Sequence, residues 1–141
     1  MIEKSTQQLQ EELTSAADLN LFLAENKNVF NQANFAEQLQ VLFQKSGLTK
    51  AALAKRAGTS EIYLYQIFSG DRTPSRDRTL CLCFGLGASL EEAQTLLKHS
   101  GMAELYVRDR RDAIIMFGLA NKMALETVND KLFSENEATL C

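Results

Sequence analysis

An all-α fold is predicted by two features of the chain, its composition and the spacing of its apolar residues. The 141 residues include only seven glycines and one proline, whereas strand-rich folds need more turn residues. Apolar residues recur every three or four positions in several stretches, as in amphipathic helices. The hydrophobic content of 45% and the charged content of 23% are ordinary for a folded domain.

The first third of the chain predicts short N-terminal helices followed by a longer one. Residues 5–26 are expected to form one or two helices, with a break near Thr14–Ser15. Asn34 and Glu37 have the three-residue spacing of a capping box, which predicts that the longer helix begins at Asn34. Gly47 is the expected end of this helix.

Two short helices are expected between Gly47 and Gly70. Thr49 is a candidate N-cap for the first, which should end at Gly58. Thr59 or Ser60 should begin the second.

Three further helices are expected after Gly70 and before the last one. Pro74 is expected in the first turn of a helix that buries Leu80, Cys81 and Phe84. Ser89 and Glu92 form a second capping box, which predicts a helix ending at Gly101. A further helix should begin near Asp109.

The last two predicted helices are more apolar than a solvated tail requires. The helix from Asp109 is expected to bury Ile114, Ile115, Phe117 and Leu119, and Gly118 weakens the prediction that it is unbroken. The final helix is expected at about Lys122–Ser134. The apolar residues either pack onto the same chain, including its N-terminal helices, or form a homodimer interface through 109–134, and both can hold together.

Charge is distributed unevenly along the chain. The formal net charge is −3, but residues 34–85 carry seven basic and four acidic side chains. Residues 1–33 and 86–141 are each net negative. Clustered lysine and arginine are typical of phosphate binding, so the central segment is the candidate for contact with nucleic acid.

Residues 35–98 resemble the lambda-repressor/Cro (XRE) helix-turn-helix domain. The matching pattern consists of inward-facing positions and turn residues in a fixed order: LTKAALA at 48–54, GTS at 58–60, Leu64, Ile67, Gly70, Pro74 and LGASLEE at 86–92. The resemblance implies a five-helix lambda-repressor-like core at 34–101, with helical extensions at 1–33 and 102–141, expected as one compact unit. It also implies that the helix at 60–69 enters the major groove of double-stranded DNA.

The resemblance and the helical spacing together nominate the residues that contact DNA. Candidates for reading bases are Lys50, Glu61, Ile62, Tyr63 and Gln66. Gln66 is suited to pair with adenine and Ile62 to pack on a thymine methyl. Candidates for contacting phosphates are Lys45, Lys55, Arg56, Tyr65, Arg72, Arg76 and Arg78.

Five of these assignments have a structural alternative. Tyr63 and Tyr65 can pack on neighbouring helices with their hydroxyls in water. Arg76 and Arg78 can pair with Asp71 and Asp77. Glu61 either accepts a hydrogen bond from cytosine or serves the helix N-terminus, where negative charge is favourable.

One departure from the family gives a test of the alignment. Many relatives carry a buried ion pair between the first and third helices, and the aligned positions here are Phe43 and Phe68. Replacing both members of such a pair by apolar residues can be neutral or stabilising. The two rings are therefore expected to be in contact.

The sequence shows no catalytic constellation, and neither an enzyme nor a cofactor is expected. His99 is the only histidine, so a single chain cannot supply a site with several histidines. Cys81 and Cys83 lack metal-ligand spacing and are expected to be buried. An odd number of cysteines, a polar start and no apolar run of membrane-spanning length predict a cytoplasmic location.

Two functions are compatible with these observations. The first is a sequence-specific DNA-binding transcriptional regulator, favoured by the basic segment and by Lys50 and Gln66. The second is a protein-interaction module, such as an adaptor or antitoxin, built on a helix-turn-helix frame. The overall acidity, Glu61 and the two tyrosines favour the second.

Overall fold

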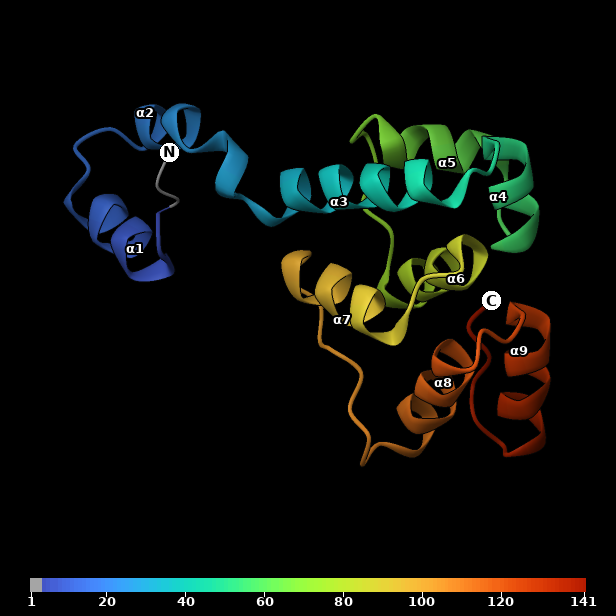
Figure 1. The fold of residues 1–141 in the computed structure, drawn as a ribbon. Coiled ribbons are helices and arrows are strands. Elements are labelled where there is room, and N and C mark those ends of the chain that lie inside the picture. The colour runs from blue at the N-terminus through green and yellow to red at the C-terminus, as the bar shows by residue number, and fades with distance from the viewer. Residues whose placement is uncertain (1–3) are drawn as a thin grey trace.

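The computed structural model describes residues 4–141, apart from the side chains of Asn28 and of residues 31–34, and these residues are all-helical, as predicted. A short 3-10 turn at Lys27–Val29 (η1) follows α2. The α-helices in chain order are α1 (Thr6–Ser15), α2 (Leu19–Glu25), α3 (Asn31–Ser46), α4 (Lys50–Arg56), α5 (Glu61–Phe68), α6 (Arg76–Leu86), α7 (Leu90–His99), α8 (Arg110–Ala120) and α9 (Leu125–Ser134) (Figure 1).

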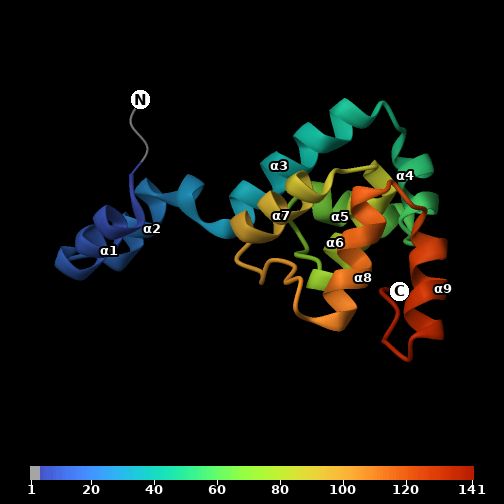
Figure 2. The same ribbon diagram turned by 60° about the horizontal axis from the view of Figure 1, so that its bottom comes forward.

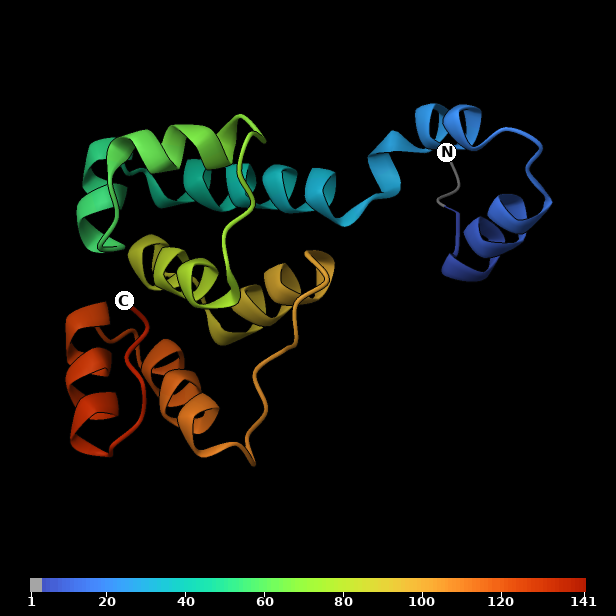
Figure 3. The same ribbon diagram turned by 180° about the vertical axis from the view of Figure 1, so that it is seen from behind.

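The helices from α3 onward are stacked in three tiers. In Figure 1, α3, α4 and α5 form the upper tier, α6 and α7 the middle one, and α8 and α9 the lower one. The view from behind in Figure 3 shows the same order. Helices α1 and α2 lie to one side, beyond the start of α3, also in the turned view of Figure 2.

Helix α6 is the centre of the hydrophobic core. Every residue from Thr79 to Leu86 is buried. A helix that is buried all round must have neighbours on each side, and α6 packs against α3, α4, α7 and α9. Gly85 permits the close approach of α4, since an added Cβ would lie 3.0 Å from atoms of Leu53 and Ala57.

Several predicted caps are confirmed. Thr49 caps α4 by accepting a hydrogen bond from the Ala52 N–H, and Ser89 and Glu92 form the expected capping box of α7. Ser60, rather than Thr59, caps α5. Asp109 caps α8.

Three predicted helix boundaries are wrong. Helix α3 begins at Asn31, three residues before the predicted cap at Asn34, whose side chain lies outside the described part. Pro74 is buried just before Ser75, which caps α6, so it precedes the first helical turn. Helix α9 begins at Leu125, after the expected start at about Lys122. The predicted break near Thr14–Ser15 is confirmed, since α1 ends at Ser15 and α2 begins at Leu19.

The predicted contact between Phe43 and Phe68 is confirmed. The ring centroids are 5.0 Å apart, with an interplanar angle of 53°. Tilted aromatic pairs at this separation stabilise a fold by roughly 0.5–1.5 kcal/mol beyond simple burial. The pair joins α3 to α5 and so fixes the orientation of α5 on the core.

The last two helices pack onto the middle tier and not onto α1 or α2. Helix α8 contacts α7, and α9 contacts α6. Ile115 and Leu119 are buried as expected and Ile114 is half-buried, but Phe117 is 64% exposed. The expectation that all four are buried is therefore wrong for Phe117, because only one face of α8 meets the core.

Candidate nucleic-acid interface

Helix α5 presents one face to the core and the other to the outside of the molecule. Leu64 and Ile67 are fully buried, which holds the helix against α3 and α4. Ile62 is 72% exposed and Tyr65 is 53% exposed. Because α8 and α9 lie on the far side of the middle tier (Figure 1), they do not cover this outer face.

The two tyrosines of α5 hold cations beside the helix. The guanidinium carbons of Arg72 and Arg78 lie 5.3 Å and 5.6 Å from the centroid of the Tyr63 ring. The Lys50 ammonium lies 4.6 Å from the Tyr65 ring centroid. At these distances the negative face of a ring attracts a cation.

The backbone adds a further constraint on Arg72. Its N–H donates a hydrogen bond to the carbonyl oxygen of Gln66, at 3.1 Å, which folds the chain after α5 back beside the helix. Gln66 itself is half-buried, and Glu61 is exposed in the first turn of α5. Glu61 thus stands where the helix dipole favours a negative charge.

Comparison with known families identifies this part of the chain. Residues 34–96 match the family model described as a helix-turn-helix domain. This segment is a helix-turn-helix domain. The match agrees with the resemblance to lambda-repressor-like proteins, and it contains α4, α5 and the turn between them. No curated protein and no solved structure gave a significant match to the chain.

Arg76 does not belong to the surface of the helix-turn-helix domain that surrounds α5. Its guanidinium donates to both carboxylate oxygens of Asp112, at 3.2 Å and 3.0 Å, and to the backbone oxygens of Ala103 and Glu104. Through these hydrogen bonds, Arg76 connects α6 to α8 and to the loop before α8. We therefore remove Arg76 from the candidate phosphate contacts.

The alternative prediction, in which Arg76 and Arg78 pair with Asp71 and Asp77, is also wrong. Asp77 accepts a bidentate pair of hydrogen bonds from Arg111. Asp71 accepts a hydrogen bond from the Ser69 hydroxyl. Arg78 stays exposed beside Tyr63.

Three other predicted cations lie away from α5. The Lys45 ammonium is 2.9 Å from a carboxylate oxygen of Glu92. The Ser89 N–H, together with Lys45, holds the pKa of the Glu92 carboxyl below its ordinary value. Lys55 and Arg56 lie at the opposite end of α4 from Lys50, where they line a pocket.

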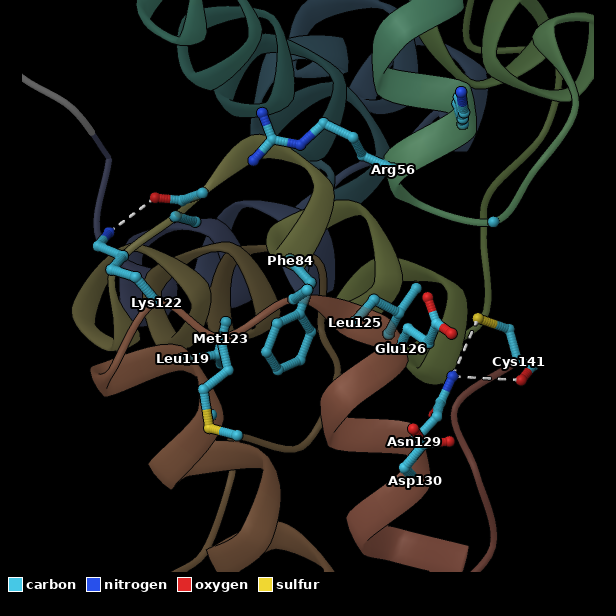
Figure 4. Close-up of a pocket in the computed structure, with 16 residues that line it drawn as sticks. Arg56, Phe84, Leu119, Lys122, Met123, Leu125, Glu126, Asn129, Asp130 and Cys141 are labelled. Carbon is cyan, nitrogen blue, oxygen red and sulfur yellow. Dashed lines mark hydrogen bonds between the residues drawn. The ribbon is translucent and has the colours of Figure 1, made fainter.

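This pocket lies between the helix-turn-helix domain and the C-terminal helices (Figure 4). Its volume is about 840 Å³, and its wall includes Phe84, Leu119, Met123, Leu125 and Asn129. The pocket could not be predicted from the sequence. The residues that line it come from separate segments between Lys55 and Cys141, and no local sequence pattern indicates that these segments meet.

The described part of the chain has neither a membrane-spanning helix nor a cluster of metal ligands. Residues 4–141 include no helix with the length and apolar character needed to cross a membrane. The same residues include no cluster of three or more histidine, cysteine or acidic side chains suited to hold a metal ion.

Proposed function

We propose that this protein binds double-stranded DNA through α5 in the major groove and regulates transcription in a sequence-specific way. One observation carries the proposal, namely the exposed outer face of α5 with Lys50, Arg72 and Arg78 held beside it. In helix-turn-helix proteins the second helix of the motif lies in the major groove and contacts base edges. Here that helix is α5.

The exposed and half-buried residues on the outer face of α5 divide into two roles. Gln66 is suited to bidentate pairing with adenine, and Ile62 to apolar contact with a thymine methyl. Tyr63 and Tyr65 position the cations through their rings. Arg72 and Arg78 contact phosphates, and Lys50 adds positive charge at the start of α4.

The proposal is tested by fluorescence anisotropy with a duplex selected from a randomised pool, titrated at two salt concentrations. Replacing Arg72 or Arg78 by alanine should weaken binding and reduce the salt slope by about 0.9 for each phosphate that the variant no longer neutralises. Gln66→Ala should instead change the preferred sequence, with a cost of about 1–3 kcal/mol at its own base pair.

Arg108→Ala is the matched control. Arg108 is also exposed, but it lies two residues before α8, a helix of the tier farthest from α5 (Figure 1). Its removal changes the net charge by the same amount and should leave the salt slope unchanged. If Arg108→Ala and Arg72→Ala had equal effects, the cations beside Tyr63 would not be the DNA contacts.

A selection that enriches no sequence would favour the second candidate, a protein-interaction module. The observation behind that candidate is the outer surface of α8 and α9, where Phe117 is 64% and Phe133 77% exposed. An apolar groove of about 610 Å³ lies between the two helices and is lined in part by Ile114, Phe117 and Met123.

For a DNA regulator, we propose that this surface pairs two copies of the chain through residues 109–134. Large exposed aromatic side chains are typical of interfaces, and helix-turn-helix dimers read two half-sites about one helical turn apart. A pairing surface on the tier farthest from α5 would leave both copies of α5 free for DNA.

A further inference from the structure

The segment 136–141 is held in a defined position on the C-terminal helices. Arg111 donates hydrogen bonds to the backbone oxygens of Ala138 and Thr139. Asn129 accepts a hydrogen bond from the Leu140 N–H at 2.8 Å, and the Leu140 side chain is buried. These interactions with α8 and α9 determine where Cys141 lies.

Cys141 lies directly against a buried cysteine of the core. Its Sγ is 2.9 Å from the Sγ of Cys81 on α6, compared with about 2.0 Å in a disulfide. The Asn129 side-chain amide donates to the Cys141 backbone oxygen at 3.3 Å and lies 3.9 Å from its sulfur (Figure 4). Cys81 is 1% exposed, whereas Cys141 is exposed to solvent.

We propose that Cys81 and Cys141 form an oxidation site at which a hydroperoxide is reduced and an intrachain disulfide is made. The inference rests on the contact between the two sulfurs and on the hydrogen bonds that position Cys141. It does not depend on DNA binding. Disulfides in reducing compartments are usually transient and often redox-sensing, which fits a pair of free thiols in contact.

The two cysteines have different roles in the reaction. Burial and the hydrogen bond to Cys141 raise the pKa of the Cys81 thiol, so Cys81 keeps its proton. Cys141 is the exposed residue of the pair and lines the pocket beside α4, so its sulfur attacks the hydroperoxide and its proton passes to the leaving oxygen. The O–O bond breaks, Cys141 becomes a sulfenic acid, and an alcohol or water leaves.

The second step closes the disulfide. The Cys81 sulfur attacks the Cys141 sulfur, the S–S bond forms and the S–O bond breaks. The proton of Cys81 leaves with the hydroxyl group as water. Two thiols thus lose two electrons and two protons in total, and one hydroperoxide is reduced.

The disulfide would link the segment 136–141 covalently to the helix-turn-helix domain. An added Cβ at Gly58, in the turn between α4 and α5, would lie 3.5 Å from the Cys141 Sγ. Cys81 belongs to α6, the core helix on which α4 packs. Oxidation should therefore raise the midpoint of thermal unfolding and protect residues 136–141 from proteolysis.

Cys83 provides a matched control. It lies on the same helix, is fully buried, and burial raises the pKa of its thiol to about 12. The Cys83→Ser variant should form the same disulfide as the parent protein. Cys81→Ser should form none, and its Cys141 should proceed to sulfinic acid because the second thiol is missing.

The test uses the full chain, reduced and then treated with hydrogen peroxide under native conditions. Remaining thiols are alkylated in denaturant and the products are identified by intact mass and peptide mapping. The expected product is a monomer, two hydrogens lighter, with residues 81 and 141 linked and only Cys83 alkylated. The proposal is overturned by a Cys141–Cys141 link between chains, by equal sulfinic acid formation with and without Cys81, or by thiols that survive excess peroxide.

Discussion

At the scale of single residues, Tyr63 and Tyr65 act through their rings. From the sequence, Tyr63 is a candidate for reading bases and Tyr65 a candidate for contacting phosphates. In the structure the rings lie against Lys50, Arg72 and Arg78, so the aromatic faces place positive charge around α5. A helix that carries no basic residue of its own is thereby surrounded by cations from its neighbours.

Gly118 is a residue at which helix propensity and packing oppose each other. Propensity alone favours Gly118→Ala by about 1 kcal/mol. However, the added Cβ would lie 2.4 Å from Cγ2 of Val128 and 3.2 Å from Cε1 of Phe84. Since overpacking typically costs about 1–3 kcal/mol, we expect Gly118→Ala to lower the free energy of unfolding in urea denaturation.

Val128→Ala in the Gly118→Ala background should recover part of that loss, because it removes the methyl group that clashes. Greater stability of Gly118→Ala than of the parent protein would show that α8 and α9 are less closely packed than in this structure.

Glu92 gives a prediction about pH. Its carboxyl has a pKa below the ordinary 4.5, first because the Ser89 N–H donates to it and then because Lys45 is nearby. A lowered folded pKa means that its stabilisation is complete above the unfolded pKa and is lost as pH falls through the folded value. Glu92→Gln should therefore flatten the decline in unfolding free energy below pH 4.5.

Lys45→Met should flatten that decline only partly, since the larger contribution comes from the Ser89 backbone. The measurement is denaturant unfolding at a series of acidic pH values. Identical curves for Glu92→Gln and the parent protein would contradict the assignment.

At the scale of elements, α6 is the helix whose environment sequence reasoning described least well. The prediction gave it one buried side, with Leu80, Cys81 and Phe84. Instead, all residues from Thr79 to Leu86 are buried, because helices from three tiers meet around it. A run such as LCLCFGL is compatible with either environment, and only the number of neighbouring helices distinguishes them.

The connection between α6 and α8 depends on the pair formed by Arg76 and Asp112. Asp112 is 7% exposed, and Arg76→Ala would leave its carboxylate without the guanidinium. Removing one member of a buried pair costs about 3–5 kcal/mol, and the partial exposure of Arg76 reduces this to roughly 2–4 kcal/mol.

Thermal and urea unfolding of Arg76→Ala should show this loss, whereas Arg108→Ala, at an exposed site, should stay within about 0.5 kcal/mol of the parent protein. The double variant Arg76→Ala/Asp112→Ala should lose less than the sum of its parts. Equal stability of Arg76→Ala and Arg108→Ala would mean that the pair formed by Arg76 and Asp112 does not contribute to the free energy of unfolding.

At the scale of the whole molecule, charge and apolar surface are separated. Lys50, Arg72 and Arg78 lie beside the tyrosine rings of α5, a helix of the upper tier of Figure 1, whereas the exposed Phe117 and Phe133 belong to α8 and α9 in the lower tier. A net charge of −3 is thus compatible with DNA binding, because phosphates respond to local charge within about a Debye length. The division of the chain at 33/34 and at 101/102 stays a prediction.

Pairing through α8 and α9 is tested with the variant Phe117→Ser/Phe133→Ser. Sedimentation should show a dimer for the parent protein and a monomer for the variant, and the variant should lose affinity for a two-half-site operator. Tyr106→Ser is the control, since Tyr106 is 58% exposed but lies outside α8 and α9. A parent protein that stays monomeric with and without DNA would contradict the pairing.

Local sequence patterns were enough to predict the helices of the core, most of their caps and the helix-turn-helix domain. These features depend on local spacing, on residues such as Thr49 and Ser60 at helix starts, and on an ordered pattern of turn residues. The contact between Phe43 and Phe68 also followed, because the alignment placed both positions on facing helices.

The contacts between charged and reactive groups, in contrast, depend on how the helices pack in three dimensions. Arg76 and Asp112 are 36 residues apart, and Cys81 and Cys141 are 60 apart. Residues so far apart in the sequence come into contact because the three tiers of helices stack on one another. That stacking depends on the shapes of all the buried side chains together. No local pattern along the chain carries that information.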